Sequence, residues 1–258
     1  MMKDIQNQKE FRGIRLNEVG IKHIKLPVRI LDKGKKVQHT IAEFHLVVSL
    51  DKNKRGTHMS RFVEILDEYI KKDLNLKVLG EIVSEMKKRL EAIDSKIIMK
   101  FPYFKRKMSP ISRKESILNY ECCFTCTGKN FEDKIIEVNV PITTLCPCSK
   151  EISRFGAHNQ RGFARVRIIS SKNIWIEDII NLVEKEASCE IFPLLKRVDE
   201  KYVTEKAYMN PKFVEDVVRD VVKKLKKNKS IISYEIGLLN NESIHLHDAY
   251  ASVSGEVK

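Results

Sequence analysis

Cys146 and Cys148 are separated only by Pro147, and His158 lies ten residues beyond the second cysteine. A thiolate, an imidazole and a carboxylate from elsewhere in the chain could supply the three protein ligands of a catalytic zinc ion, with a fourth position left for water. The alternative is a pair of buried, inert cysteines and a hydrogen-bonded histidine, because a C-x-C pair is a weak motif by itself. The surrounding residues favour a binding pocket over a core, since they are polar. They are Ser149, Lys150, Glu151, Asn159, Gln160 and Arg161.

Two further segments carry more charged groups than plain structure requires. Arg55, His58 and Arg61 gather at the predicted start of a helix, which is a ready anion site, although an ordinary capped surface turn fits the same residues. Residues 195–211 are predicted to form a long, charged loop between helices, and long ordered loops are usually functional. A solvated connector is the alternative for that loop.

Two more candidates lie near the end of the chain. Glu215 precedes Arg219 by four residues, so the two could form a surface pair on a helix. Glu242 precedes His245 and His247, which are predicted to lie on the same side of a strand. Two histidines on one face of a strand suit proton transfer or metal binding. The alternative is that they lie together on an exposed surface by chance.

The composition narrows the class of protein. The chain has 258 residues, 42% of them hydrophobic, and a formal net charge of +13, which favours polyanionic partners such as nucleic acids or the phosphates of a small ligand. Few aromatic residues interleave with the lysines as base-stacking platforms would, so most lysines are assigned to solvated helix faces. The polar start and the absence of a long apolar run predict a cytoplasmic protein without a membrane span.

The cysteines divide into two groups. In a reducing compartment, closely spaced cysteines indicate metal binding or reactive thiols before disulfides. Cys122, Cys123 and Cys126 lie in a predicted strand, where Cys123 and Cys126 face opposite sides, and we assign them to packing. Cys189, at the predicted end of an apolar helix, receives the same assignment.

The hydrophobic pattern predicts the same order of elements twice. In the first half we expect a hairpin, two helices, the first capped by Thr57, and two strands, at 22–31, 37–50, 59–72, 79–93, 95–104 and 117–128. In the second half we expect two strands, two helices and two strands, at 133–143, 162–170, 176–188, 211–227, 231–239 and 245–253. The predicted fold is α+β, with two ββααββ modules, each an antiparallel sheet with its helices on one face. The predicted divisions are an arm at 1–18 and modules at 19–130 and 131–258.

Long segments of the sequence resemble one known family. The segments 145-LCPCSKEISRFGAHNQR-161, 57-THMSRF-62, 194-LLKRVDEKYVTEKAYMNPKFVED-216 and 242-ESIHLHDAYA-251 are similar to those of the type IB GTP cyclohydrolases. These are metal-dependent enzymes of the tunnelling-fold superfamily, and the resemblance spans nearly the whole chain. It implies a bimodular tunnelling fold and a homotetramer with active sites near the subunit interfaces, and it implies neither a nucleic-acid nor a membrane partner.

The resemblance also implies a reaction and a set of site residues. GTP and water would give formate and 7,8-dihydroneopterin triphosphate, in the first step of tetrahydrofolate biosynthesis. Cys146, His158 and Glu200 match the family's metal ligands, and zinc, manganese or iron would suit this set. Glu215 matches the residue that grips the guanine edge. At position 246 this chain has leucine, where relatives often have asparagine. The difference is expected to affect the edge of the pocket and not the metal ligands.

The chemistry explains why these residue types are needed. Attack on the guanine ring needs a water ionised near neutral pH, and a metal lowers the pKa of water from 15.7 to about 7. His245 or His247 is the candidate acid or base, with Glu242 beside them, and Cys148 is expected to shape the site next to the thiolate ligand. Basic residues are expected to bind the triphosphate. The substrate-binding candidates besides Glu215 are Arg55, His58, Arg61, Lys150 and Arg161.

Three other functions fit parts of the sequence. An archaeal-type GTP cyclohydrolase would give a 2',3'-cyclic phosphate with ferrous iron. A nitrile reductase of the same fold would use a lone catalytic cysteine and NADPH, whereas here Cys146 is accompanied by His158. The charge of +13 would also suit a nonenzymatic nucleic-acid-binding protein, which would bind generic RNA in a salt-dependent manner.

Overall fold

The chain is described by a computed structural model, which covers residue 6, residues 8–128 and residues 134–257. The chain divides into two compact units. Unit 1 combines the chain up to Pro102 with the segment Cys123–Ile136, and unit 2 combines Tyr103–Cys122 with the chain from Glu137 onwards. The predicted boundary at residues 130 and 131 lies outside the described residues.

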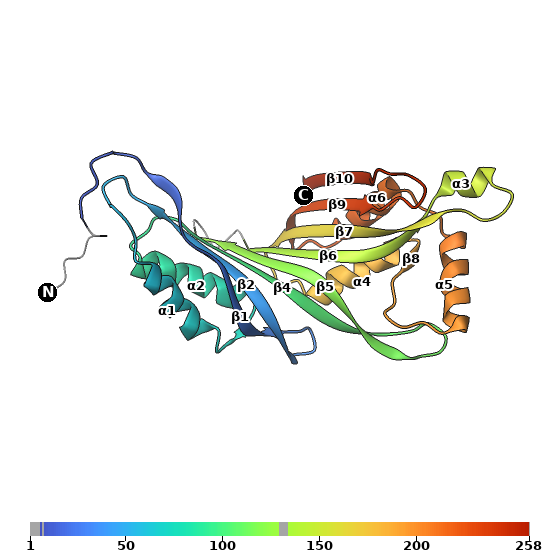
Figure 1. Ribbon diagram of the computed structural model, residues 1–258, viewed down its shortest axis with the longest axis horizontal. Coiled ribbons are helices and arrows are strands. Elements are labelled where there is room, and N and C mark those ends of the chain that lie inside the picture. The colour runs from blue at the N-terminus through green and yellow to red at the C-terminus, as the bar shows by residue number, and fades with distance from the viewer. Residues whose placement is uncertain (1–5, 7, 129–133, 258) are drawn as a thin grey trace. The chain divides into compact units, whose positions relative to one another are not determined.

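Unit 1 is a sheet with two helices on one face (Figure 1). Strands β1 (Leu16–Leu31) and β2 (Val37–Leu50) form the predicted antiparallel hairpin, and the short β3 (Asp73–Leu74) pairs with β1 in parallel. Helices α1 (Met59–Tyr69) and α2 (Leu76–Arg89) bury their apolar faces, which include Phe62, Ile65, Leu79 and Ile82. The predicted elements of this unit are therefore confirmed, with shifted ends.

The starts of the two helices differ from the prediction. His58, and not Thr57, is the N-cap of α1, and no side chain caps the helix there. Thr57 is buried instead. Helix α2 begins three residues before the predicted start, because the Asn75 side chain accepts hydrogen bonds from the backbone N–H groups of Lys77 and Val78.

Strands β4 (Ser95–Met108), β5 (Glu115–Thr127) and β6 (Lys134–Leu145) each contribute residues to both units. In unit 1, the sheet runs in the order β3-β1-β2-β4-β5. In unit 2, β6 is followed by β7 (Asn159–Ser170), β9 (Ile231–Asn240) and β10 (Ala249–Glu256). The described strands belong to one 10-stranded sheet, in place of the two separate sheets predicted. The α+β class with antiparallel pairing of the long strands is confirmed.

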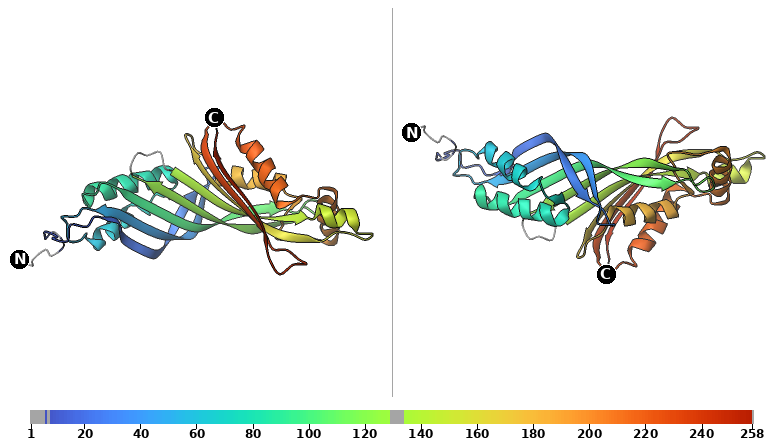
Figure 2. Two further views of the ribbon diagram at one scale, coloured as in Figure 1. Left: turned by 90° about the horizontal axis from the view of Figure 1, so that it is seen from above. Right: turned by 90° about the horizontal axis from the view of Figure 1, so that it is seen from below.

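Helices α4 (Ile176–Glu186) and α6 (Val214–Leu225) lie on one face of the sheet of unit 2 (Figure 2). Their buried residues are Ile179, Ile180, Val183, Val217, Val218 and Val221, among others. Both helices were predicted from their apolar spacing, and α6 begins and ends within the predicted range. No helix among the described residues is both long and apolar enough to span a bilayer.

Three elements of unit 2 were not predicted. Helix α3 (Pro147–Ile152) replaces the loop expected after Cys146, and the short β8 (Cys189–Glu190) pairs with β6. Residues 195–211, predicted to be a loop, contain helix α5 (Arg197–Met209). The last strand also begins at Ala249, so residues 245–248 are not part of it.

The cysteines assigned to packing are buried or half-buried. Cys122 and Cys126 point into the core from one face of β5, and Cys123 lies half-buried on the other. Burial raises the pKa of the Cys126 thiol to about 12. Cys189 belongs to β8 and not to the end of a helix, but it is buried as expected, and burial raises its pKa. The thiols of Cys126 and Cys189 therefore stay protonated at neutral pH.

A buried ion pair joins α4 to β4 within unit 2. The Glu184 carboxylate accepts hydrogen bonds from Lys107 Nζ at 2.7 Å and from the Tyr120 hydroxyl at 2.8 Å. Lys107 also donates to the backbone oxygen of Ile191 at 2.7 Å. Burial and the Glu184 charge raise the pKa of Tyr120. Because each charged group has a partner, the cluster is compatible with the surrounding core.

Candidate active site

Cys146 and His158 are held together by the backbone. The Cys146 N–H donates to the His158 carbonyl oxygen at 3.1 Å, and the His158 N–H donates to Ser149 Oγ at 3.2 Å. Cys146 is also the N-cap of α3, with Pro147 at the first helical position, where a missing N–H costs nothing. Its sulfur accepts a hydrogen bond from the Ser149 N–H at 3.4 Å. Cys146 is half-buried, whereas Cys148 is exposed.

The ring of His158 is oriented by a chain of buried polar side chains. His158 Nδ1 lies 3.0 Å from Gln160 Oε1, and Gln160 Nε2 donates to Thr144 Oγ1 at 3.0 Å. Asn240 Nδ2 donates to the same hydroxyl oxygen at 2.7 Å. An amide oxygen can only accept, so the proton is on Nδ1 and the lone pair of Nε2 is left for another ligand. The sequence showed Gln160 only as a polar neighbour, and no short motif marks Thr144 or Asn240.

Glu242 approaches the same histidine. Its Oε2 lies 3.9 Å from His158 Nδ1, and both side chains are largely covered, with exposed fractions of 11% and 14%. The structure thus brings together three of the predicted site residues, Cys146, His158 and Glu242. Among the described residues, however, Cys146, His158 and Glu200 do not form a group with all ligand atoms within 4.8 Å of one another.

Glu200 lies on the face of α5 that packs toward this turn. Val203 and Ala207 of α5 contact a small core that includes Leu145 and Ala157, the residues next to Cys146 and His158. Glu200 precedes Val203 by three residues and Ala207 by seven, so it shares their face of the helix, one turn further along. The Glu200 side chain itself is exposed.

The start of α5 is fixed by Asp199, which sequence reasoning left unassigned. This buried carboxylate accepts hydrogen bonds from the backbone N–H groups of Ile111, Ser112 and Lys196, and from the Ser112 hydroxyl. Burial by itself raises the pKa of Asp199, but these hydrogen bonds outweigh it and hold the pKa below the ordinary value. Helix α5 is thereby anchored to the loop between β4 and β5 at the residue next to Glu200.

The donor atoms fit a divalent transition metal. A thiolate, an imidazole Nε2 and a carboxylate are the ligand types of three-ligand catalytic zinc sites, and manganese or iron are also compatible. Two observations support this fit for the residues in place. The hydrogen bond of His158 Nδ1 to Gln160 leaves Nε2 available, and the Cys146 sulfur accepts a hydrogen bond from the Ser149 N–H.

One complete metal-ligand group exists among the described residues, and it lies in unit 1. His23, Glu43 and His45 each offer a ligand atom within 4.8 Å of the other two. Sequence reasoning missed it, because His23 and His45 come from different strands and only the hairpin register brings them together. The spacing of Glu43 and His45, two residues apart in a strand, was the one available signal.

Glu215 lies in the first turn of α6 and is exposed. It lines a pocket of about 330 Å³ between α6 and β10, together with Val218, Val222 and Val253. Arg219 and Glu215 do not form the surface ion pair that their spacing of four residues allows. Its guanidinium lies 3.8 Å from Asp216, and within the described part of the chain the Glu215 carboxylate has no recorded hydrogen bond or ion pair. The carboxylate is therefore available to a ligand.

His245 and His247 lie in the loop before β10, which corrects the predicted strand. Their rings are nevertheless together, stacked with centroids 5.0 Å apart and planes 15° apart. Both are exposed, as is Leu246 between them. The two rings are therefore brought together within a loop, and not through the alternation of a strand.

The basic candidates are placed in different surroundings. Lys150 donates from Nζ to the Tyr208 carbonyl oxygen at 2.6 Å, and Arg161 lines a pocket of about 360 Å³ between β7, β8 and α5. In unit 1, Arg55 donates to Gln8 Oε1 and Arg61 to the Arg89 carbonyl oxygen, each at 2.8 Å. His58 is the half-buried N-cap residue of α1. Arg61 therefore has a structural role at the end of α2.

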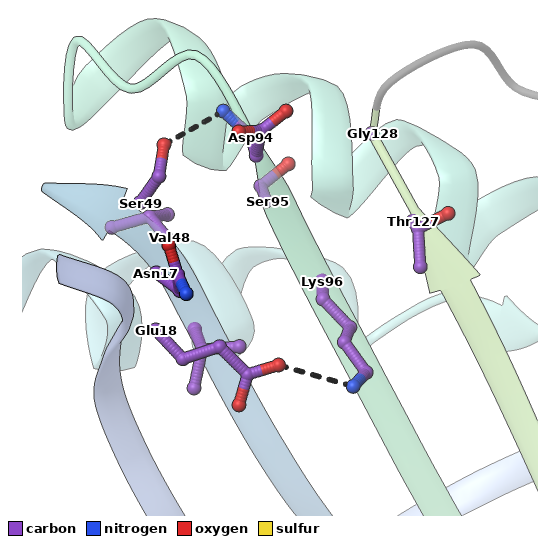
Figure 3. Close-up of a pocket in the computed structure, with 10 residues that line it drawn as sticks. Asn17, Glu18, Val48, Ser49, Asp94, Ser95, Lys96, Thr127 and Gly128 are labelled. Atoms are coloured by element: carbon purple, nitrogen blue, oxygen red, sulfur yellow. Dashed lines mark hydrogen bonds and ion pairs between the residues drawn. The ribbon is translucent and has the colours of Figure 1, made fainter. Parts of the chain in front are cut away.

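A smaller pocket of unit 1 contains none of the predicted site residues (Figure 3). It measures about 260 Å³, below the usual range of roughly 300 to 1,000 Å³ for small-molecule sites. Its charged groups are paired with protein. Glu18 Oε1 lies 3.1 Å from Lys96 Nζ, and Asp94 Oδ2 lies 2.6 Å from the Arg15 guanidinium. The pocket is not a candidate active site.

Comparison with solved structures identifies the class of fold. A hyperthermostable mutant of Bacillus sp. TB-90 urate oxidase gives a TM-score of 0.56 at 6% identity, covering 93% of this chain and 98% of that one. A highly active mutant of the same urate oxidase gives a TM-score of 0.55, also at 6% identity. At such identity the likeness shows the fold alone. It is the tunnelling fold that the sequence predicted.

Sequence comparison identifies the family within that fold. A family model described as type I GTP cyclohydrolase folE2 matches residues 2–251. GTP cyclohydrolase FolE2 of Thermosipho africanus is 50% identical over 256 residues, covering 99% of this chain and 98% of the relative. GTP cyclohydrolase FolE2 of Nitrosococcus oceani is 48% identical over 256 residues, covering 99% and 96%. The chain belongs to the type I GTP cyclohydrolase FolE2 family.

Proposed function

We propose that this chain is a type IB GTP cyclohydrolase, which hydrolyses GTP to 7,8-dihydroneopterin triphosphate and formate in the first step of tetrahydrofolate biosynthesis. The observation that carries the proposal is the turn that holds Cys146 beside His158, with Nδ1 of the histidine bonded to Gln160 and Nε2 left for a ligand. This arrangement occurs in a chain that matches the family over residues 2–251.

Cys146, His158 and Glu200 are the residues proposed to hold one divalent ion, which would be zinc, manganese or iron. Such an ion supplies a water that is ionised near neutral pH. The packing of α5 against Leu145 and Ala157 supports the inclusion of Glu200, because it places Glu200 on the face of α5 that is turned toward Cys146 and His158. Cys148 is proposed to shape the site as a neighbour of the ligand.

The remaining residues are proposed to bind the base and move protons. Glu215 accepts hydrogen bonds from two guanine N–H groups. Its carboxylate lines the pocket beside β10 and has no partner among the described residues, which supports this role. Adenine would leave the Glu215 carboxylate without these hydrogen bonds, which explains a preference for GTP. His245 and His247, with Glu242 nearby in sequence, are the proposed proton donors and acceptors for ring opening.

The triphosphate is proposed to bind basic side chains, of which Arg161 and Lys150 are the best placed. Arg161 lines the pocket next to Gln160, and Lys150 lies one turn after Cys146. Arg55, His58 and Arg61 stay candidates from the sequence. Because Arg61 already bonds the end of α2, it is expected to contribute least.

A homotetramer with active sites near the subunit interfaces is part of the same proposal. Apolar side chains beside the site are almost fully exposed in the single chain, at 85% for Ile152 and 82% for Phe155. Leu246, between the two stacked histidines, is fully exposed. Clusters of exposed apolar side chains mark interaction surfaces. A neighbouring subunit that covers them would also enclose the exposed Glu200 and His245.

The test is to incubate the metal-reconstituted protein with GTP and to measure formate together with the fluorescent oxidised pterin. Equimolar formation of both is expected, and Cys146→Ala, prepared in parallel, should form neither. Mass spectrometry of the product should give the triphosphate. A 2',3'-cyclic phosphate would assign the archaeal-type reaction instead, and formation of neither product by the parent protein would reject the proposal.

A further inference from the structure

The hairpin of unit 1 brings two histidines and a glutamate to one point. His23 Nδ1 lies 3.2 Å from Glu43 Oε1, and His45 Nε2 lies 3.1 Å from the same oxygen. The two rings meet edge to face, with centroids 4.9 Å apart. Glu43 and His45 are two residues apart in β2 and therefore share a face of the sheet.

A β-bulge brings His23 to that face. Ile21 pairs with Leu46 and Ile24 pairs with Phe44, so Lys22 and His23 together oppose the single residue His45. His23 takes a positive φ of 63°, in the left-handed region that side-chain-bearing residues rarely adopt. Backbone strain of this kind persists only where the surrounding structure maintains it, and it is common at ligand sites.

Two of the three separations between these atoms are close to those of a metal site, and the third, between His23 and His45, is within 4.8 Å. In a tetrahedral site with bonds of roughly 2.0 to 2.1 Å to nitrogen and oxygen, neighbouring ligand atoms are about 3.3 Å apart. The observed separations from Glu43 Oε1 are 3.2 Å to His23 and 3.1 Å to His45. To accommodate an ion, the separation would have to grow by only about 0.1 to 0.2 Å in each of these two pairs.

We propose that His23, Glu43 and His45 form a second site for a divalent transition metal, separate in its residues from the proposed catalytic set, which pins the bulge of β1 to β2. Two imidazoles and a carboxylate suit zinc, manganese, iron or cobalt, and water completes the coordination. The site rests on residues of unit 1 alone and does not depend on the reaction proposed above.

The charge state of the group is compatible with metal binding. Hydrogen bonds from His45 and His23 lower the pKa of Glu43, so its carboxylate is ionised at neutral pH. Metal binding requires each histidine to present a lone pair, so binding displaces the hydrogens now directed at Glu43. Lys25 lies 3.8 Å from the other carboxylate oxygen, Oε2, and so does not occupy the atom that faces both rings.

Cobalt distinguishes this site from the proposed catalytic one. Co²⁺ bound by a cysteine thiolate shows a sulfur-to-metal charge-transfer band in the near ultraviolet, and Co²⁺ bound by His, Glu and water shows only its visible d–d bands. Cys146→Ala removes the thiolate of the catalytic set. The untagged Cys146→Ala protein, titrated with Co²⁺, should therefore bind one equivalent per chain without the charge-transfer band.

The same titration, carried out on double variants, shows which residues bind that equivalent of Co²⁺. Cys146→Ala/His45→Ala should weaken Co²⁺ binding at least about 100-fold, since even residues behind the ligands contribute tenfold to 100-fold. Cys146→Ala/Glu43→Gln, which keeps the size of the side chain, tests the same point if the alanine variant fails to fold. Cys146→Ala/His39→Ala is the matched control, because His39 is an exposed histidine on the same strand and the same face as His45.

Retention of the equivalent by the His39 control and its loss from the His45 and Glu43 variants would support the site. The proposal is overturned if Cys146→Ala binds no Co²⁺ at micromolar concentrations. It is equally overturned if the His45 and Glu43 variants bind as tightly as Cys146→Ala, or if the His39 control loses as much affinity as they do. None of these outcomes depends on whether the parent protein turns over GTP.

Discussion

Gln160→Met is expected to weaken metal binding without touching any proposed ligand. Gln160 is 7% exposed and makes two hydrogen bonds of 3.0 Å, one from His158 Nδ1 and one to Thr144 Oγ1. Methionine fills a similar volume but can make neither bond. The His158 ring then loses both the restraint on its orientation and the preference for the tautomer that frees Nε2.

The size of the effect follows from this role. Loss of a partner behind a ligating histidine costs tenfold to 100-fold in metal affinity, which corresponds to about 1.4 to 2.7 kcal/mol. The free energy of unfolding should also fall by roughly 1 to 3 kcal/mol, because two hydrogen bonds of about 0.5 to 1.5 kcal/mol each are lost. The two losses are measured separately.

The assay is a competition titration of zinc against a chromophoric chelator at fixed pH, with denaturant unfolding of the metal-free protein as the second measurement. Gln160→Glu is the matched control. Its carboxylate can accept from both His158 Nδ1 and the Thr144 hydroxyl, so zinc affinity should equal or exceed that of the parent. Parental zinc affinity in Gln160→Met would refute the role assigned to Gln160, as would equal weakening in the glutamate variant.

Four further substitutions test other parts of the chain. Cys146→Ala should lose most of the zinc of the catalytic set together with turnover, whereas Cys148→Ser should keep the zinc and lose part of the activity; equal zinc loss in both would show that both sulfurs are ligands. Glu215→Gln should weaken GTP binding at least roughly tenfold in a calorimetric titration at unchanged metal content, since a charged hydrogen bond contributes about 1.5 to 3 kcal/mol; unchanged affinity would remove Glu215 from the guanine site. Glu184→Ala should lower the free energy of unfolding by about 3 to 5 kcal/mol, because it leaves Lys107 buried without its partner, and a loss below about 1 kcal/mol in urea unfolding would contradict the buried pair.

The elements with a strong apolar pattern could be predicted from the sequence. The hairpin of residues 22–31 and 37–50 was correct because Asp32 and Gly34 mark the turn between two apolar runs. Helix α6 was correct because Val217, Val218 and Val221 repeat at helical spacing. In both cases burial of one face decides the structure, and burial leaves a periodic trace in the sequence.

Helix α5 left no such trace. Of its residues only Asp199 and Ala207 are buried, and one of these is charged, so the segment looks like a polar loop. What starts the helix is the Asp199 carboxylate, which bonds the Lys196 N–H and the loop around Ser112, a contact across 87 residues of sequence. A capping contact of that range cannot be deduced from local propensity.

The candidate site was predictable only in part for a similar reason. The ligand types at Cys146 and His158 stand out in the sequence, and the backbone bond between them confirms that they lie together. The residues behind them do not stand out, because Thr144 and Asn240 are ordinary strand residues until the sheet places them next to Gln160. The group around His23 was missed because a bulge, and not strand alternation, orients its first member.

The division of β4, β5 and β6 between the two units has a consequence for how the chain can be cut and how it folds. The backbone passes from one unit to the other at Pro102, at Cys122 and at Ile136, so neither unit is a contiguous stretch of polypeptide. No single truncation or proteolytic nick can release one unit intact. During synthesis, unit 1 cannot complete its packing until the segment that ends at Ile136 has been made. Contacts between segments so far apart in the sequence slow folding. Expression of a half-length fragment is therefore expected to give an aggregating product with open strand edges, and not a folded module.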